Sequence, residues 1–404
     1  MTMKQHKRWQ IVVLLLLVAL SLQSCLGIGG GNNGFQTKST GGTQIGVNQT
    51  DQAIFQGKIY FTLNRSLDTL DGKHDIKNLT RRLDVRDPAV SPDGKWVAFI
   101  IRHLNYSDLA IMPSNGGTIR ILLSGNGQFV ANPGFAPKST HNWYAQPSWG
   151  QDSKHLLFLS DLAKSTQGPG PGINAFLLDL QAFEISIENP KATLQAIAYA
   201  NYGDGGNRDA SYRPHHPDQV IYTHYAYDTT NTKQVIQLFL EDANAITNNP
   251  GKYRPGATGY EFDPAVALTP ATPDLANLQP AFSPDGNSIA YVRRLDATHM
   301  GIFVMPVAEN VTQNPNDPAV VKKALAPYAK SALLLSGQYI SQPAWSPDGT
   351  KFAYIGYNNN TFDLWMANVS KDAKSGKYTI KGTPIQLTDT GGKLDADSRP
   401  FWTP

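Results

Sequence analysis

The stretch Ser341-Gln342-Pro343-Ala344-Trp345-Ser346-Pro347-Asp348-Gly349 decides the fold, because the chain repeats it. Close or weaker copies start at Asp87, Gln146, Asp209 and Gln279. A last copy, Arg399-Pro400-Phe401-Trp402-Thr403-Pro404, stands at the C-terminus. Repetition sustained along a chain is typical of stacked supersecondary units rather than of one irregular domain.

Each repeat predicts a unit of four short strands. After the turn Pro92-Asp93-Gly94, β-prone runs follow at residues 95–100, 109–112 and 118–123. Proline and glycine favour such a turn, and a four-stranded meander of roughly 40 residues has the size of one propeller blade. In the third unit we expect the later strands at 175–178 and 184–187, and in the fifth a short helix at 319–330.

The two ends of the chain predict how the propeller closes. Residues 57–80 contain three β-prone runs without a first strand, and the C-terminal copy supplies a first strand. Pairing them completes one blade and removes exposed edges, which such folds avoid. We therefore expect an all-β, six-bladed β-propeller of four-stranded antiparallel blades over residues 54–404.

The N-terminus resembles a bacterial lipoprotein leader. Lys4, Lys7 and Arg8 precede the apolar run 11–20, which is shorter than the ~20 residues needed to span a bilayer but suits a signal peptide. Leu22-Gln23-Ser24-Cys25 resembles a lipobox, and Cys25 is the single cysteine of the chain. The resemblance implies a signal peptide at 1–24, lipidation of Cys25 and an address outside the cytoplasm, at the cell membrane or an outer membrane. An ordinary secretory signal or an uncleaved anchor are the alternatives.

Composition predicts a tether and excludes one class of partner. Residues 25–53 are rich in Gly, Asn, Ser and Thr, so we expect a flexible tether there. Three of the 35 basic residues lie in the leader, and the rest of the chain has as many basic as acidic residues. A neutral body without a Lys/Arg run lacks the electrostatic footprint of a nucleic-acid-binding protein.

The repeat, with following strands such as Lys351-Phe352-Ala353-Tyr354-Ile355, resembles that of TolB-type (WD40-like) β-propellers. The resemblance covers about residues 54–404 and implies a six-bladed propeller. TolB itself carries an α/β domain before its propeller, which has no counterpart here, so a role in the Tol–Pal system does not follow. Physical reasoning gives the repeat residues structural roles: the aromatic position packs between blades, and Asp-Gly closes the turn.

The candidate ligand site is the mouth of the central channel. Residues that enter the innermost strands tend to line this mouth, and here they are polar. They are Asp87, Gln146, Asp209, Gln279, Gln342 and Arg399, with Arg86, Arg208 and Asp397 close to the same rim. The ring either recognises a ligand, since sites favour concave places with convergent polar groups, or is the wet wall of any channel.

Metal binding is a weaker alternative. Asp204 lies in a Gly- and Asn-rich loop (201–209) that could hold Ca²⁺, but without EF-hand spacing. His215 and His224 could bind a transition metal, and some propeller lyases that act on oligogalacturonides share this repeat type and use histidine-bound metal. His215 and His216, however, point to opposite faces of a strand.

We therefore expect a lipid-anchored, non-catalytic binding or scaffold module for a protein, peptide or glycan at the cell envelope, without a cofactor. A bound divalent cation stays open. The alternative is a carbohydrate-active enzyme, such as a metal-dependent oligosaccharide lyase that uses the channel mouth. The Gly-Xaa-Ser-Xaa-Gly, His-Glu-Xaa-Xaa-His and P-loop motifs do not occur in the sequence.

Overall fold

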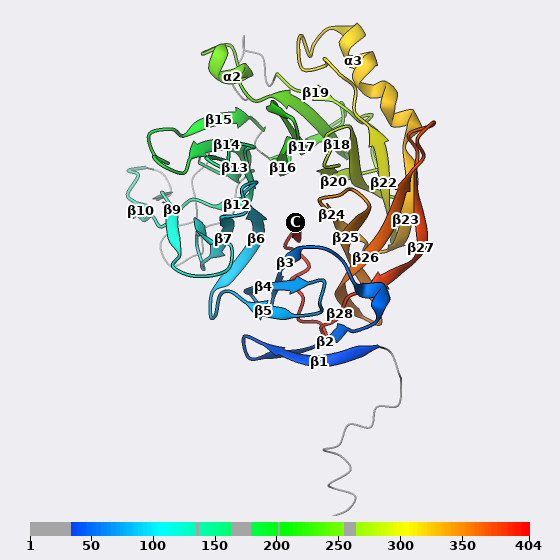
Figure 1. Cartoon of the computed structure of the whole chain (residues 1–404). Helices are drawn as coiled ribbons and strands as arrows, with labels where there is room; N and C mark the ends of the chain where they lie inside the picture. The colour runs from blue at the N-terminus through cyan, green and yellow to red at the C-terminus, as the bar shows by residue number, and fades with distance from the viewer. Residues whose placement is uncertain (1–33, 135–136, 163–178, 201–202, 254–263) are drawn as a thin grey trace, which may run out of the picture.

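The computed structural model describes residues 34–134, 137–162, 179–200, 203–253 and 264–404. Six four-stranded antiparallel sheets surround a central axis (Figure 1). Each is named below as a blade after its innermost strand. From inner to outer strand, three blades are β6–β9 (Asp84–Val90, Trp96–Arg102, Ser107–Pro113, Arg120–Ser124), β12–β15 (Tyr144–Trp149, His155–Ser160, Gln181–Ser186, Gln195–Ala198) and β16–β19 (Asn207–Arg213, His216–Tyr227, Gln234–Asp242, Val266–Ala267).

The other three blades complete the ring. They are β20–β23 (Asn277–Phe282, Ser288–Arg294, His299–Pro306, Ala332–Gln338), β24–β27 (Ser341–Trp345, Lys351–Asn358, Thr361–Lys371, Tyr378–Gln386) and β29 with β3–β5 (Phe401–Thr403, Lys58–Leu63, Ser66–Asp71, Ile76–Asn78). In the last blade the C-terminal strand pairs with the N-terminal one, with Trp402 opposite Ile59. The chain ends therefore join in one blade, as their sequences predict.

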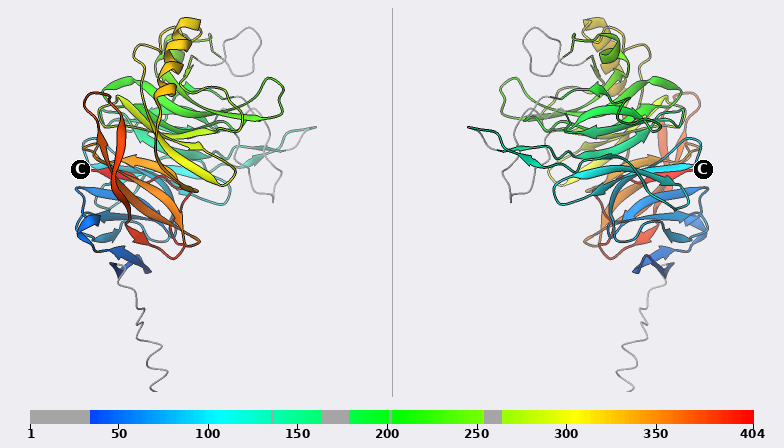
Figure 2. Two further views of the ribbon diagram at one scale, coloured as in Figure 1. Left: turned by 90° about the vertical axis from the view of Figure 1, so that its right-hand side faces the viewer. Right: turned by 90° about the vertical axis from the view of Figure 1, so that its left-hand side faces the viewer.

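A seventh sheet overturns the prediction of six blades. Strands β1 (Phe35–Thr40), β2 (Thr43–Asn48) and β28 (Thr388–Asp389) form a three-stranded sheet at the edge of the ring, next to the β29 blade (Figure 2). Ile45 and Val47 are buried in one hydrophobic cluster with residues of the β29 and β24 blades. The described part of the chain thus forms a propeller of seven blades, six of four strands and one of three.

The same strands correct the predicted tether. Residues 34–53 hold β1, β2 and the 3-10 turn η1 (Asp51–Ala53), whereas residues 25–33 lie outside the described residues. Gly41 and Gly42 both have positive φ and form a tight hairpin turn. The prediction of a flexible tether used composition alone. Composition does not reveal this turn or the alternating apolar residues of β2.

A second correction concerns the β12 blade. Its third and fourth strands are β14 and β15, one strand later in the chain than predicted, and residues 175–178 lie outside the described residues. The sequence also missed the hairpin β10 (Phe129–Val130) and β11 (Lys138–Ser139) and the short helix α2 (Ala245–Asn248). The expected helix exists as α3 (Pro318–Leu325) followed by η2 (Ala326–Lys330).

The repeat motif builds a turn with internal hydrogen bonds. The Ser346 hydroxyl donates to the Asp348 carboxylate at 2.6 Å, and Asp348 accepts the Thr350 N–H at 3.0 Å. The two other complete copies repeat both contacts. Gly349 has a φ of 68°, which glycine adopts readily. The motif therefore specifies the turn between the first and second strands.

The repeat tryptophans join neighbouring blades, as the sequence predicts. The Trp345 indole N–H donates to the Ala281 carbonyl of the preceding blade at 3.1 Å, and Trp149 contacts Ala89 in the same way at 2.9 Å. Both side chains are buried in hydrophobic clusters. Burial of the ring and satisfaction of its N–H explain the preference for tryptophan here.

Candidate functional site

The predicted ring positions share an unusual backbone conformation. In five innermost strands the residue before the repeat proline, or its equivalent, has a left-handed φ and coincides with a β-bulge. These residues, called the polar ring below, are Asp87 (54°), Gln146 (50°), Asp209 (57°), Gln279 (54°) and Gln342 (53°). Because a bulge redirects the strand and its side chains, each of these five blades places one polar residue at the equivalent position of its innermost strand.

The polar ring connects neighbouring blades by hydrogen bonds. The Asp87 carboxylate accepts the backbone N–H of Gln146 at 3.3 Å and that of Arg399 at 3.1 Å. The Gln279 side chain accepts the Gln342 N–H at 2.9 Å. In each case a side chain of one bulge satisfies the backbone of another blade's first strand. These bonds assign a structural role to the polar ring.

Asp209 is the most connected member of the polar ring. Its backbone N–H donates to the Gln146 side chain at 2.6 Å, and its carboxylate accepts the Gln146 amide at 2.9 Å. The Thr223 hydroxyl donates to the same carboxylate and accepts the Gln279 N–H. Burial raises the pKa of Asp209 and of Asp87, while the positive charge of Arg399 opposes the rise in both.

The side chains of two arginines at this rim do not hydrogen-bond to side chains of the polar ring. Arg208 donates to the Asn207 carbonyl at 2.7 Å and lies 5.9 Å from the Tyr225 ring centre. Arg399 donates through Nη2 to the Pro147 carbonyl at 3.0 Å, and its Nε is buried without an acceptor in the described part of the chain. The positive charges of Arg399 and Arg208 both lower the pKa of the Asp209 carboxyl and oppose the effect of its burial.

Neither guanidinium group has a carboxylate within ion-pair distance among the described residues. Burial lowers the pKa of Arg208, which nevertheless keeps its charge at any physiological pH. Charged groups that are partly desolvated and lack an ion-pair partner are typical of binding sites. Arg208 and Arg399 are thus the residues of this rim that can take a ligand.

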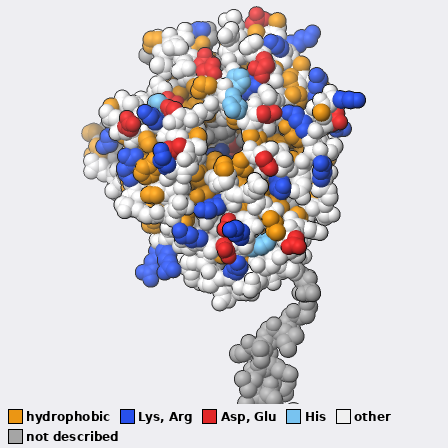
Figure 3. Space-filling model, viewed as in Figure 1, with side chains coloured by type: hydrophobic (Ala, Val, Ile, Leu, Met, Phe, Trp, Pro, Cys, Tyr) orange, Lys and Arg blue, Asp and Glu red, His pale blue; other side chains and the backbone are white. Residues whose placement is uncertain are grey.

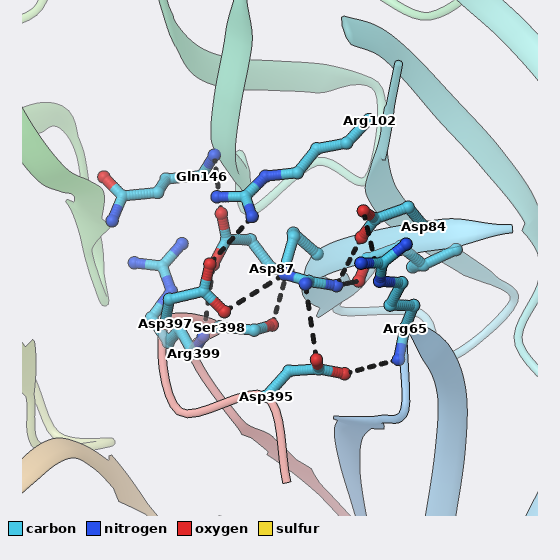
Figure 4. A network of polar contacts seen from close by, with 11 residues as sticks. Arg65, Asp84, Asp87, Arg102, Gln146, Asp395, Asp397, Ser398 and Arg399 are labelled. Carbon is cyan, nitrogen blue, oxygen red and sulfur yellow. Dashed lines mark hydrogen bonds and ion pairs between the residues drawn. The ribbon is translucent and has the colours of Figure 1, made fainter. Parts of the chain in front are cut away.

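A charged cluster beside the polar ring fixes the closing segment (Figure 4). The buried Arg86 pairs with Asp84 at 2.6 Å, Asp397 at 3.1 Å and Asp395 at 3.3 Å. Arg102 pairs with Asp397 at 2.8 Å. Burial opposes ionisation of Asp397, but Arg86 and Arg102 outweigh it and lower the pKa of this carboxyl. The cluster thereby holds the segment between β28 and β29 against β6.

The structure separates the predicted metal ligands. His215 is exposed in the turn before β17, whereas His224 is buried in the second half of that strand and faces Asn207 of β16. The His224 ring contacts Asn207 at 2.8 Å and Phe239, and burial lowers its pKa to about 4. Three or more acidic, histidine or cysteine side chains do not gather in metal-binding geometry anywhere in the described ranges.

The predicted Ca²⁺ loop is arranged around an acid rather than presenting oxygens. The backbone N–H groups of Gly203 and Gly205 both donate to the Asp179 carboxylate. The Asp204 carbonyl accepts the Gln234 amide at 2.8 Å. Residues 201 and 202 lie outside the described residues. Glycine N–H groups that surround a carboxylate suit an anion, not a cation.

Sequence reasoning identified Arg208 and Arg399 but missed Tyr225, Thr223 and Arg102. These three stand on second strands, at the rim of the channel, where no repeat motif marks them. Cys25 lies outside the described residues, so its predicted lipidation stays a prediction. In the described ranges, helices are all shorter or more polar than a membrane span requires.

No protein-family model matches the chain. Among solved structures it is similar to TolB from Acinetobacter baumannii, with a TM-score of 0.53 at 16% identity over 86% of this chain and 67% of that one. It is also similar to an oligogalacturonate lyase in complex with manganese, with a TM-score of 0.45 at 12% identity over 85% and 82%. The likeness to TolB supports a TolB-like propeller fold and carries no function.

Proposed function

We propose that this chain is a non-catalytic binding module of the cell envelope, whose channel mouth holds an acidic group of a protein, peptide or glycan. The observation that carries the proposal is the pair Arg208 and Arg399, both half-buried and without a carboxylate partner in the described chain. A carboxylate bound between them would pair with both guanidinium groups. Arginine suits this task because its planar fork matches a carboxylate.

The surroundings of the two arginines support recognition. Tyr225 lies beside Arg208 and is half-buried, so it can pack against a ligand while the guanidinium pairs with the acid. Tyrosine and arginine are enriched among residues that dominate binding energy at interfaces. The body is hollowed at its centre in the space-filling view (Figure 3), and concave places with few polar groups are favoured ligand sites.

The acids of the polar ring favour a binding role over catalysis. The Asp87 carboxylate already accepts backbone N–H groups of two other blades. The Asp209 carboxylate accepts the Gln146 side-chain amide and the Thr223 hydroxyl, so neither acid is available as a general base without loss of these contacts. The separation of His215 from His224 gives the metal-dependent lyase no support.

We also propose that Cys25 carries a lipid that anchors the chain outside the cytoplasm. The leader and lipobox-like segment 22–25 support this address. Fractionation of cells that produce the wild-type chain or Cys25→Ser tests it. We expect the wild-type chain in the membrane fraction and the variant without an attached lipid. A wild-type chain that carries no lipid by mass spectrometry would contradict the anchor, but it would leave the binding proposal intact.

A thermal-shift screen of the purified chain against acidic oligosaccharides and acidic cell-wall peptides tests binding. A ligand present at 100 times its Kd stabilises by about 2.7 kcal/mol. We expect the shift to vanish in Arg208→Gln/Arg399→Gln and to persist in the matched control Arg120→Gln, an exposed arginine on β9. Equal shifts in both variants would contradict a site at the channel mouth.

A further inference from the structure

The outermost strand of the β20 blade differs from the other outer strands. Strand β23 runs for seven residues, Ala-Leu-Leu-Leu-Ser-Gly-Gln, without a charge or a proline. The outer strands β5 and β9 carry Lys77 and Arg120, and β27 carries Lys381 and Pro384. Strands β15 and β19 have four and two residues and lie beside α2 and α3. Charges, prolines, shortness and bulges are the usual protections of a sheet edge. Of these β23 has a single bulge, at Leu334.

The edge of β23 is open. Among the described strands β23 pairs with β22 alone, and β27 of the next blade packs near it. Leu334 and Leu335 pack on a core cluster, whereas Leu333 is 50% exposed. A row of unpaired backbone groups flanked by exposed leucine is a template for another strand.

An apolar patch adjoins this edge. Leu333 and Leu295 are both exposed large hydrophobic residues, and both approach Gly301 of β22. A Cβ atom at Gly301 would lie 2.7 Å from Leu333 and 3.3 Å from Leu295. The glycine therefore lets the two leucines lie side by side on the surface, where contiguous apolar area marks an interaction site.

We infer that β23 pairs with β23 of a second copy of this chain, antiparallel and about a two-fold axis. Pairing of identical strands in this way is isologous, so one surface completes itself. Because the strand has no charge, the pairing brings no like charges together. The interface is separate from the channel mouth and does not depend on the ligand proposed there.

The strand is complementary to itself in a particular register. If Leu335 lies on the two-fold axis, Leu333 of one copy stands opposite Gly337 of the other. A Cβ atom built at Gly337 meets nothing within 4 Å, so this position has room for the partner copy's leucine. The two four-stranded blades would then form one continuous sheet across the dimer.

The test uses the full chain purified from membranes in mild detergent, with mass measured in solution over a range of concentrations. We expect a dimer that weakens at least about tenfold in Leu333→Lys, since a lysine at the edge disfavours strand pairing. The matched control Ile121→Lys changes an exposed apolar residue of the outer strand β9 and should leave the dimer unchanged. A wild-type chain that is monomeric throughout, or a dimer indifferent to Leu333→Lys, would overturn the inference.

Cysteine cross-linking provides a second measurement that does not rely on weakening the dimer. Opposed residues of an antiparallel pair lie about 4.5–5.5 Å apart at Cα, within disulfide reach. Leu335→Cys should form a disulfide-linked dimer on mild oxidation, whereas Ile121→Cys and the wild-type chain should not. Absence of cross-links from Leu335→Cys, Leu333→Cys and Ser336→Cys alike would exclude pairing through β23.

Discussion

Gln146 and Asp209 hold each other across the boundary between two blades. The side-chain amide of Gln146 donates to the Asp209 carboxylate at 2.9 Å. The backbone N–H of Asp209 donates to the side-chain oxygen of Gln146 at 2.6 Å. The two residues are 63 positions apart, and each has a left-handed backbone at a β-bulge. This reciprocal contact shows how positions that look like a binding surface in the sequence act as a joint between blades.

Gln146→Ala should lower the free energy of unfolding by about 1–3 kcal/mol, because the buried Asp209 N–H loses its acceptor. Chemical denaturation measures the change. The control Gln44→Ala removes an exposed glutamine of β2 and should stay within about 0.5 kcal/mol of the wild-type chain. Equal losses in the two variants would contradict a structural role of the polar ring.

Arg86→Ala should be among the most destabilising single changes at this rim. It would leave Asp84, Asp395 and Asp397 near one another without their shared buried cation, at a cost of about 3–5 kcal/mol. Arg65, whose side chain is 72% exposed, also lies near Asp84, and Arg65→Ala should cost less than about 1 kcal/mol. Denaturation of both variants compares them, and a milder effect for Arg86 would count against the cluster as the clamp of the closing segment.

The buried carboxyl of Asp68 should make the stability of the chain depend on pH. It is almost fully buried at the contact between the N-terminal hairpin and β4, where Thr40 and Asn78 donate to it. Burial raises its pKa to about 6, above the value of 3.8 expected when unfolded. Between these values the folded state binds more protons, so this group's contribution to stability is present at low pH and is lost as pH rises through 6.

The Asp68→Asn variant should therefore lose less stability than the wild-type chain between pH 4 and pH 7, by about 2–3 kcal/mol. Thermal unfolding at several pH values measures the difference. Thr40→Val removes a donor to the charged carboxylate, so it should destabilise the chain more at neutral than at acidic pH. Parallel pH profiles for the wild-type chain and Asp68→Asn would contradict the raised pKa.

The sequence predicted most of the propeller because its turns are local. Ser346, Asp348 and Gly349 specify their turn through contacts within a few residues, and Trp345 marks the blade boundary. The seventh sheet was missed because β28 has two residues and joins a hairpin more than 300 positions earlier in the chain. The alternating apolar residues of β2 are typical of a strand, but no sequence pattern indicates a partner at that separation.

The candidate site residues share a backbone feature that the sequence does not show. Spacing relative to the repeat proline singled out Asp87, Gln279 and Gln342, and the structure gives all three a left-handed backbone. Their hydrogen bonds to other blades follow from bulges, and no sequence pattern indicates which strand bulges. Arg208 and Arg399 stand out only when the structure shows which charges lack a carboxylate partner.

The measurement that tests the central claim most directly is a calorimetric titration of the first acidic ligand found, against the wild-type chain and Arg208→Gln, at low and high salt. Removal of one partner of a buried charge pair typically weakens binding by about 2–5 kcal/mol. We predict a loss of this size in Arg208→Gln and weaker binding of the wild-type chain at high salt. Equal affinity of the two proteins, unchanged by salt, would contradict recognition of an acidic group at the channel mouth.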